Sequence, residues 1–148
     1  MRADARDWAN FDTSVLVKAY WEEPGTLEAA DLLARHSLLS SVIAPIELLS
    51  ALFRRRASGA LNEAQVSHVS TRIERDRKRW TLIPPDAAVL ERAEPLVQAG
   101  RIRTLDALHL ASALVFQASS GLTIPFITAD LRQREVATRA GLSVVWVG

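Results

Sequence analysis

Short apolar segments alternate with longer stretches of helical periodicity along the whole 148-residue sequence. The apolar segments have the length of buried strands, and each is bounded by a turn or a helix-cap signal. They lie at residues 8–12, 38–41, 80–83, 125–128 and 143–147. Helical periodicity covers residues 26–35, 46–56, 63–78, 87–99, 104–118 and 131–140. This order predicts an α/β fold in which helices connect the strands of a mostly parallel sheet.

The length of the chain fits one domain. Residues with hydrophobic side chains make up 49% of the sequence and charged residues 24%, as in ordinary globular proteins. No internal repeat, low-complexity tract or linker rich in Pro, Gly or Ser divides the chain. We therefore expect a single domain over residues 1–148, with residues 1–7 as a polar N-terminal arm.

Several classes of protein are excluded by composition. The chain has no cysteine, which excludes disulfide scaffolds, thiolate zinc sites, iron–sulfur clusters and cysteine nucleophiles. The longest largely apolar stretch, residues 38–53, is interrupted by polar residues and is too short to span a bilayer. The N-terminus carries both signs of charge without an apolar core, unlike a secretion signal. We expect a cytoplasmic protein with no membrane partner.

The net charge of +1 conceals an uneven distribution. Residues 52–80 contain eight Lys and Arg against three Asp and Glu, a local charge of +5, so the remainder of the chain carries −4. This basic segment predicts contact with an anionic partner, although a solvated helix surface would have the same composition.

Two aspartates follow predicted strands at the point where the chain turns into a helix. Asp12 follows the first strand and Asp130 the fourth. Parallel α/β sheets bind ligands beyond the carboxyl ends of their strands, so both side chains are candidate ligand-binding groups. Each is also a good helix N-cap, and capping alone would explain either one.

Two further acids lie in the first turns of very apolar helices. They are Glu47 and Asp106. For Glu47 the alternative is a polar stripe on an amphipathic helix, favoured by the helix dipole. Asp106 requires a partner or a metal if it is buried, because an unpaired buried carboxylate is costly. His109, three residues later, is interpreted as a packed or hydrogen-bonding residue rather than a metal ligand, since the histidines show no zinc spacing.

Four carboxylates gathered at one edge of a sheet would make an oxygen-lined site suited to Mg²⁺ or Mn²⁺. Clustered carboxylates and divalent ions serve phosphoryl hydrolysis, in which metals activate water and stabilise charge on the scissile phosphate. A neighbouring basic surface would hold the rest of a polyanionic substrate.

The order of these motifs resembles that of PIN-domain proteins of the VapC toxin type, over essentially the whole chain. The resemblance rests on FDTS at residues 11–14, IEL at 46–48, RRR at 54–56, LDALHLA at 105–111, ITAD at 127–130 and AGL at 140–142. It implies a three-layer fold with a parallel five-stranded sheet of order 3-2-1-4-5. It also implies a Mg²⁺-dependent endoribonuclease, a cognate antitoxin partner and a homodimer. The polar arm before the first strand departs from the usual family pattern.

The resemblance also implies roles for individual residues. The acidic quartet would be Asp12, Glu47, Asp106 and Asp130, with supporting hydroxyls from Thr13, Ser14 and Thr128. Three aspartates would bind Mg²⁺, for which Mn²⁺ could substitute, while Glu47 would bind it directly or through water. Metal-activated water would attack RNA and leave a 5′-phosphate and a 3′-hydroxyl. The RNA-binding residues would be Arg54, Arg55, Arg56, Arg72, Arg75 and Arg79.

Other functions remain open at this point. A phosphatase of the haloacid-dehalogenase type would need a second aspartate where Ser14 stands. A phospho-receiver domain would need paired acids at the end of the first strand, which Asp12 and Thr13 do not supply. A PIN fold that binds RNA or protein without catalysis is the main alternative, because fold does not imply function. An antitoxin groove could involve Leu48, Leu49, Leu52 and Phe53, although their helical spacing favours the core.

Overall fold

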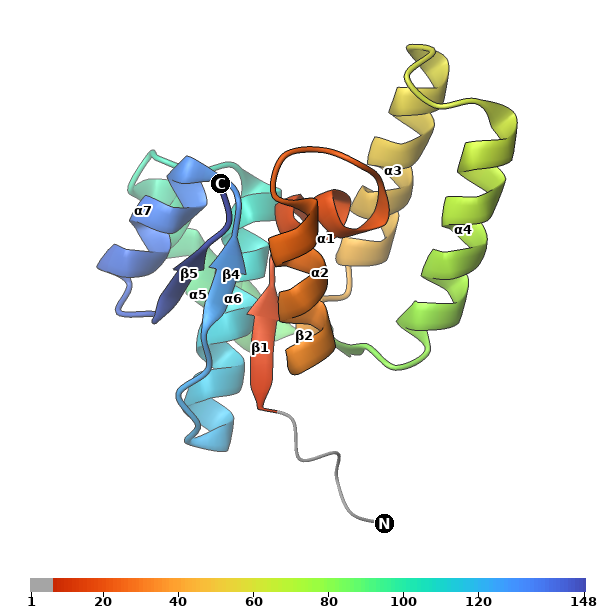
Figure 1. Ribbon diagram of the computed structural model, residues 1–148. Coiled ribbons are helices and arrows are strands. Elements are labelled where there is room, and N and C mark those ends of the chain that lie inside the picture. Colours follow the sequence, from red (N-terminus) through yellow and green to blue (C-terminus); the bar gives the residue numbers. More distant parts are fainter. Residues whose placement is uncertain (1–6) are drawn as a thin grey trace.

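The fold is a five-stranded parallel sheet between helices, as the sequence predicts (Figure 1). The computed structural model describes residues 7–148, so residues 1–6 of the expected N-terminal arm lie outside the described part. The strands are β1 (Trp8–Phe11), β2 (Ser37–Ser41), β3 (Thr81–Ile83), β4 (Phe126–Thr128) and β5 (Val144–Trp146). Their order is β3-β2-β1-β4-β5, and every neighbouring pair is parallel.

Seven helices connect the strands within residues 7–148. They are α1 (Thr13–Tyr20), α2 (Thr26–Arg35), α3 (Ala44–Ala57), α4 (Glu63–Arg77), α5 (Ala87–Gln98), α6 (Thr104–Ser120) and α7 (Leu131–Arg139). Helix α3 begins two residues before the expected residue 46, because Pro45 is accommodated in its first turn, where no backbone donor is needed. The other ends of the expected elements agree with the structure to within three residues.

Two apolar clusters pack on the helices and the sheet. One cluster joins β1 to helices α1, α2, α3 and α4 through buried residues that include Phe11, Leu16 and Leu48. The other joins β4 to helices α5, α6 and α7 through residues that include Leu110 and Phe126. Both clusters require side chains from several helices, so each fixes how the helices lie on the sheet.

The central strands set the position of the site. β1 pairs with β4, with Asn10 opposite Phe126 and Phe11 opposite Ile127. The residues that directly follow these two strands therefore emerge at the same edge of the sheet. This is the point where the connections diverge to opposite sides of β1, and α/β folds commonly bind ligands there.

Helices α3 and α4 lie side by side on one flank of the molecule and extend beyond the sheet (Figure 1). Helix α4 begins with a capping box, in which the Asn62 side chain accepts from the backbone of Gln65 and the Gln65 side chain accepts from the backbone of Asn62. Asn62 therefore caps α4. No helix within residues 7–148 has the length and apolarity needed to cross a lipid bilayer.

Candidate active site

The four predicted acids lie at one edge of the sheet, on four separate segments. Asp12 follows β1, Asp130 follows β4, and Glu47 and Asp106 lie in the first turns of α3 and α6. Glu47, Asp106 and Asp130 line a pocket of about 810 Å³. Asp12 is buried, with 2% of its surface exposed, and the side chain of Gln133 donates hydrogen bonds to both Asp12 and Asp106.

Asp12 does not cap its helix. It occupies the N-cap position of α1, but its side chain makes no capping hydrogen bond. Instead Oδ2 accepts from Ser14 Oγ at 2.5 Å and from Thr128 Oγ1 at 3.1 Å, while Oδ1 accepts from Gln133 Nε2 at 2.9 Å. Capping therefore does not explain Asp12, and three donors from three elements fix its carboxylate.

Asp130 does cap its helix. Its Oδ1 accepts from the backbone N of Gln133 at 2.9 Å, at the start of α7. The backbone N of Asp130 donates in turn to Thr128 Oγ1 at 3.0 Å. The second carboxylate oxygen has no partner within residues 7–148, and the residue lines the pocket. Asp130 thus serves both the helix and the pocket.

Glu47 belongs to a buried polar group. Its Oε1 lies 2.5 Å from His109 Nε2 and accepts from Thr13 Oγ1 at 2.9 Å. Because a carboxylate only accepts hydrogen bonds, His109 Nε2 carries a proton. Burial alone would raise the pKa of Glu47, but the hydrogen bonds from His109 and Thr13 lower it below its ordinary value.

His109 is fully buried and hydrogen-bonded, as the sequence interpretation expects. Burial alone would lower its pKa, but the hydrogen bond to Glu47 and the charges of Asp12 and Asp106 raise it. The hydrogen bond from His109 therefore holds the Glu47 carboxylate in place.

Asp106 shows how closely the acids approach one another. Burial raises the pKa of its carboxyl group, and the neighbouring charges of Asp12 and Asp130 raise it further. A group of like charges held this close favours a bound cation.

Gln133 is a site residue that the sequence interpretation missed. It lies in the first turn of α7, is 1% exposed, and donates through Nε2 to Asp12 Oδ1 at 2.9 Å and to Asp106 Oδ1 at 3.0 Å. The sequence signal was a glutamine three residues after the N-cap Asp130, a spacing that predicts a capping box rather than a site residue.

Two arginines of the pocket were also missed. Arg103 and Arg132 line the pocket beside Glu47, Asp106 and Asp130, and neither forms an ion pair or side-chain hydrogen bond with any residue in the described range 7–148. The sequence signal that could have indicated them was their closeness along the chain to the predicted acids Asp106 and Asp130. Two guanidinium groups are therefore free to bind an anion at this edge.

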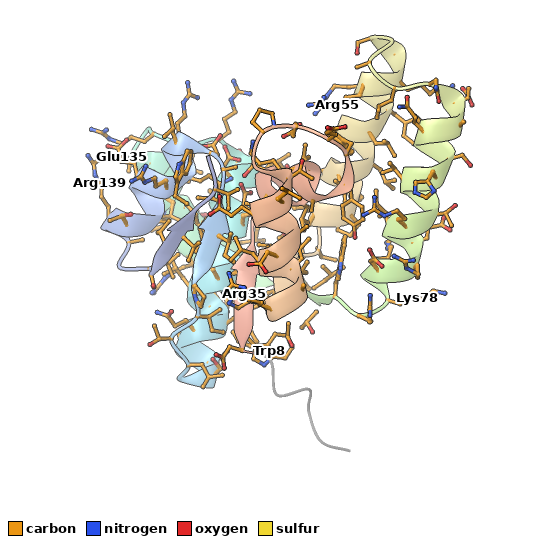
Figure 2. The ribbon with its side chains drawn as sticks, in the orientation of Figure 1. Trp8, Arg35, Arg55, Lys78, Glu135 and Arg139 are labelled. Atoms are coloured by element: carbon orange, nitrogen blue, oxygen red, sulfur yellow. The ribbon has the colours of Figure 1, made fainter. Side chains whose placement is uncertain are left out.

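The structure places five of the predicted RNA-binding arginines on α3 and α4 and Arg79 in the turn after α4, all outside the acidic pocket. Arg55 pairs with Glu23 at 2.7 Å, and Figure 2 shows it beside the loop that follows α1. Arg56 pairs with Glu63, and Arg72 packs over the Tyr20 ring. The remaining three also have partners: Arg54 donates to Ser50, while Arg75 and Arg79 bind Asp76. Each of these six arginines therefore already contacts another residue of the fold.

Exposed apolar side chains neighbour the pocket acids. Leu105 and Leu131 line the pocket and are 47% and 67% exposed, and Ile46, which precedes Glu47 in the sequence, is 71% exposed. By contrast, Leu48 and Leu52 are fully buried in the core, as their spacing predicts, and Leu49 is partly buried. The expectation is wrong for Phe53, which is 46% exposed.

The donor set fits a hard divalent cation, since it consists of carboxylate oxygens and includes no sulfur. The Gln133 amide donates to both Asp12 and Asp106, which places these two carboxylates on either side of one nitrogen. As the side chains stand, no three acidic or histidine residues among residues 7–148 already converge as metal ligands. The amide of Gln133 lies between Asp12 and Asp106, so both would close on a cation only after the amide moves.

Comparison with known families gives one match, to the PIN domain, over residues 10–139. No curated protein sequence matches the chain.

Solved structures share its fold. VapBC2 from Rickettsia felis, bound to a DNA fragment from its promoter, aligns with a TM-score of 0.64 at 16% identity and covers 95% of this chain and 98% of its own. FitAcB from Neisseria gonorrhoeae gives 0.63 at 19% identity, with coverages of 92% and 95%. VapBC-1 from nontypeable Haemophilus influenzae gives 0.60 at 19% identity, with coverages of 93% and 96%.

Proposed function

Because this chain belongs to the PIN-domain family, we propose that it is a Mg²⁺-dependent endoribonuclease and the VapC-type toxin of a VapBC toxin–antitoxin pair. The observation that carries the proposal is the gathering of Asp12, Glu47, Asp106 and Asp130 at the carboxyl edge of the sheet. We further propose that residues 1–148 form one such domain and that it acts in the cytoplasm.

The acids would hold the cation. Asp12, Asp106 and Asp130 would supply the ligands, with Glu47 binding directly or through water, and Mn²⁺ could replace Mg²⁺. When bound, the cation would stabilise negative charge on the scissile phosphate and make water a better nucleophile. The expected products are a 5′-phosphate and a 3′-hydroxyl.

The surrounding side chains would keep these acids in position. Ser14 and Thr128 donate to one oxygen of Asp12, so its carboxylate is oriented before any ligand arrives. Thr13 and His109 orient Glu47 in the same way. Fixed carboxylates lose little freedom on binding, which favours catalysis by pre-arranged charge.

Arg103 and Arg132 would bind phosphates on either side of the cleaved bond. Both line the acidic pocket, and their guanidinium groups are free within residues 7–148. The arginines of α3, of α4 and of the turn after it remain proposed contacts for more distant parts of the RNA, with a smaller share of the binding energy because four of the six are already paired with carboxylates.

The proposed partner is an antitoxin protein. The solved structures that share the fold include VapBC structures, and one of them is described as a member of the VapBC family of toxin–antitoxin systems. Leu105 and Leu131 are exposed apolar residues of the pocket wall, which a protein segment could cover. A homodimer remains a proposal based on the family.

The test is cleavage of total cellular RNA by the purified, antitoxin-free protein with Mg²⁺ or with EDTA, followed by mapping of new 5′ ends. Asp12→Asn serves as the active-site variant. Asp31→Asn is the matched control, since Asp31 lies on α2 and pairs with Arg35 at the surface. Discrete new ends that require both Mg²⁺ and Asp12, and that persist in Asp31→Asn, support the proposal.

A non-catalytic PIN domain that binds RNA or protein is the second candidate. The observation in its favour is that the Gln133 amide occupies the space between Asp12 and Asp106, so no ready cation site exists among residues 7–148. A folded protein that binds RNA but produces no new ends with Mg²⁺ or Mn²⁺ would favour this candidate over the nuclease.

A further inference from the structure

Gln133 contacts three of the four acids of the site. Its amide Nε2 donates to Asp12 Oδ1 at 2.9 Å and to Asp106 Oδ1 at 3.0 Å, and its backbone N donates to Asp130 Oδ1 at 2.9 Å. The residue is 1% exposed. Its side chain is therefore a buried connection between two carboxylates from distant parts of the sequence.

The same local pattern elsewhere in the chain behaves differently. Gln65 follows the N-cap Asn62 by three residues, as Gln133 follows Asp130, and it folds back to accept from the backbone N of Asn62 at 2.9 Å. At α7 that backbone donor binds Thr128 Oγ1 instead. The side chain of Gln133 is thus released from local capping and directed into the acidic site.

The orientation of the Gln133 amide follows from its neighbours. Ionised carboxylates only accept hydrogen bonds, so the amide must present its NH₂ group to Asp12 and Asp106. Its Oε1 is buried without a partner among the described residues. The observed side-chain conformation therefore depends on these two hydrogen bonds alone, and an unpaired buried oxygen makes it easier to displace.

A cation bound by both carboxylates would replace this amide. Mg²⁺ binds carboxylate oxygens at about 2.0–2.1 Å, which is closer than the amide nitrogen stands to either one. The two carboxylates must therefore move inward, and the amide between them must leave. The amide NH₂ and a cation compete for the same oxygens.

We propose that Gln133 is a positioning residue that holds Asp12 and Asp106 together without metal and is displaced when a divalent cation binds. Its two hydrogen bonds offset part of the repulsion between the carboxylates in the cation-free protein. They also weaken cation binding, because they must be broken first. Gln133 thereby sets the cation concentration at which the site fills, an inference that rests on the metal-dependent function proposed above.

The test compares Mn²⁺ binding by calorimetry, and melting temperature in EDTA, for the parent and Gln133→Met. Methionine keeps an unbranched side chain but has no NH₂ group. We expect Gln133→Met to melt several degrees lower in EDTA, and to bind Mn²⁺ about tenfold more tightly because no charged hydrogen bonds are broken. Gln133→Ala repeats the test if methionine prevents folding.

The matched control is Gln65→Met, which removes a glutamine from the same pattern at a distant helix. It should lower the melting temperature through loss of the cap and leave Mn²⁺ affinity unchanged. A purely structural role for Gln133 would produce that same result at position 133.

Two outcomes would overturn the inference. If the parent binds Mn²⁺ and Asp12→Asn does not, but Gln133→Met binds as the parent does or more weakly, then the amide does not compete with the cation and the metal site stands. If the parent binds no Mn²⁺ at all, the proposed metal-dependent function fails together with the inference.

Discussion

Two carboxylates in this molecule have opposite surroundings. Asp76, on α4, accepts hydrogen bonds from Tyr20 Oη and from Arg75 Nε, both at 2.9 Å, and lies within 3.5 Å of Arg79. Burial alone would raise the pKa of Asp76, but the hydrogen bonds from Arg75 and Tyr20 lower it. Asp106 has a raised pKa, because it is partly buried and faces Asp12 and Asp130.

The surroundings of Asp76 favour the folded state, whereas the acidic pocket is arranged for a proposed function. Around Asp76, a hydrogen bond from Tyr20 connects α4 to the end of α1, and the opposite charges of Arg75 and Arg79 favour the ionised carboxylate in the folded state. In the pocket, like charges are held together at a cost in stability that a bound cation would recover. Local rules are satisfied in the first region and violated in the second, as is common at functional sites.

The largest expected effect is on RNA cleavage, which should depend on the acidic pocket and not on the surroundings of Asp76. Asp12→Asn should reduce RNA cleavage at least about 100-fold, because it removes a charge from the cation-binding set. Asp76→Asn should change cleavage less than about threefold, since a distant hydrogen-bonding network rarely affects a chemical step. The measurement is initial cleavage rate with saturating Mg²⁺. Equal losses in both variants would remove the distinction.

The next effect is on stability, to which the surroundings of Asp76 should contribute more than the acidic pocket does. Asp76→Asn should lower the free energy of unfolding by about 1–2 kcal/mol, because a charged acceptor for Tyr20 Oη is lost, and the exposed arginines add little. Urea denaturation measures it. Tyr20→Phe is the companion variant and should lose about as much, whereas a cost near zero in both would show that the network does not stabilise the fold.

A third prediction concerns the two sets of arginines. Arg103→Ala with Arg132→Ala should weaken RNA binding about tenfold, since two free guanidinium groups beside the acids are lost. Arg75→Ala with Arg79→Ala should weaken it about twofold, because both side chains already bind Asp76. Binding is measured with the Asp12→Asn protein at fixed salt. The opposite ranking would favour the basic helices as the main RNA contact.

The pH dependence of stability gives a fourth test. Since the folded pKa of Asp76 lies below the unfolded value, its contribution is present above about pH 4 and is lost as the pH falls through the folded pKa. The stability difference between the parent and Asp76→Asn should be constant from about pH 5 to 7 and shrink below about pH 4. A difference that grows on acidification would contradict this sign.

The smallest effect tests how much stability the protein loses through repulsion between the carboxylates of the acidic pocket. Asp106→Asn should raise the free energy of unfolding in EDTA by about 0.5 kcal/mol, because one member of a group of like charges is neutralised. It should also reduce the stabilisation that Mn²⁺ gives the parent. Thermal melts with EDTA and with millimolar Mn²⁺ show both, and a destabilised variant in EDTA would contradict the proposed repulsion.

The fold follows from local patterns, whereas parts of the site do not. Alternating strand and helix signals predict every strand, and the resemblance supplies the sheet order that the structure shows. Asp12 and Asp130 have the same local pattern, yet only Asp130 caps a helix. The difference lies in Thr128 and Gln133, which reach Asp12 from more than 100 residues away. The sequence alone does not show such contacts.

The pairing of β1 with β4 has a consequence for protein synthesis. Asp12 and its partner Thr128 are 116 residues apart, and Gln133 comes 121 residues after Asp12. The acids can therefore come together only after residue 133 has left the ribosome, and closing so long a loop makes this a late step in folding. A growing chain that has not yet exposed Thr128 and Gln133 lacks the contacts that orient Asp12, so the proposed activity would begin only after these residues have been made.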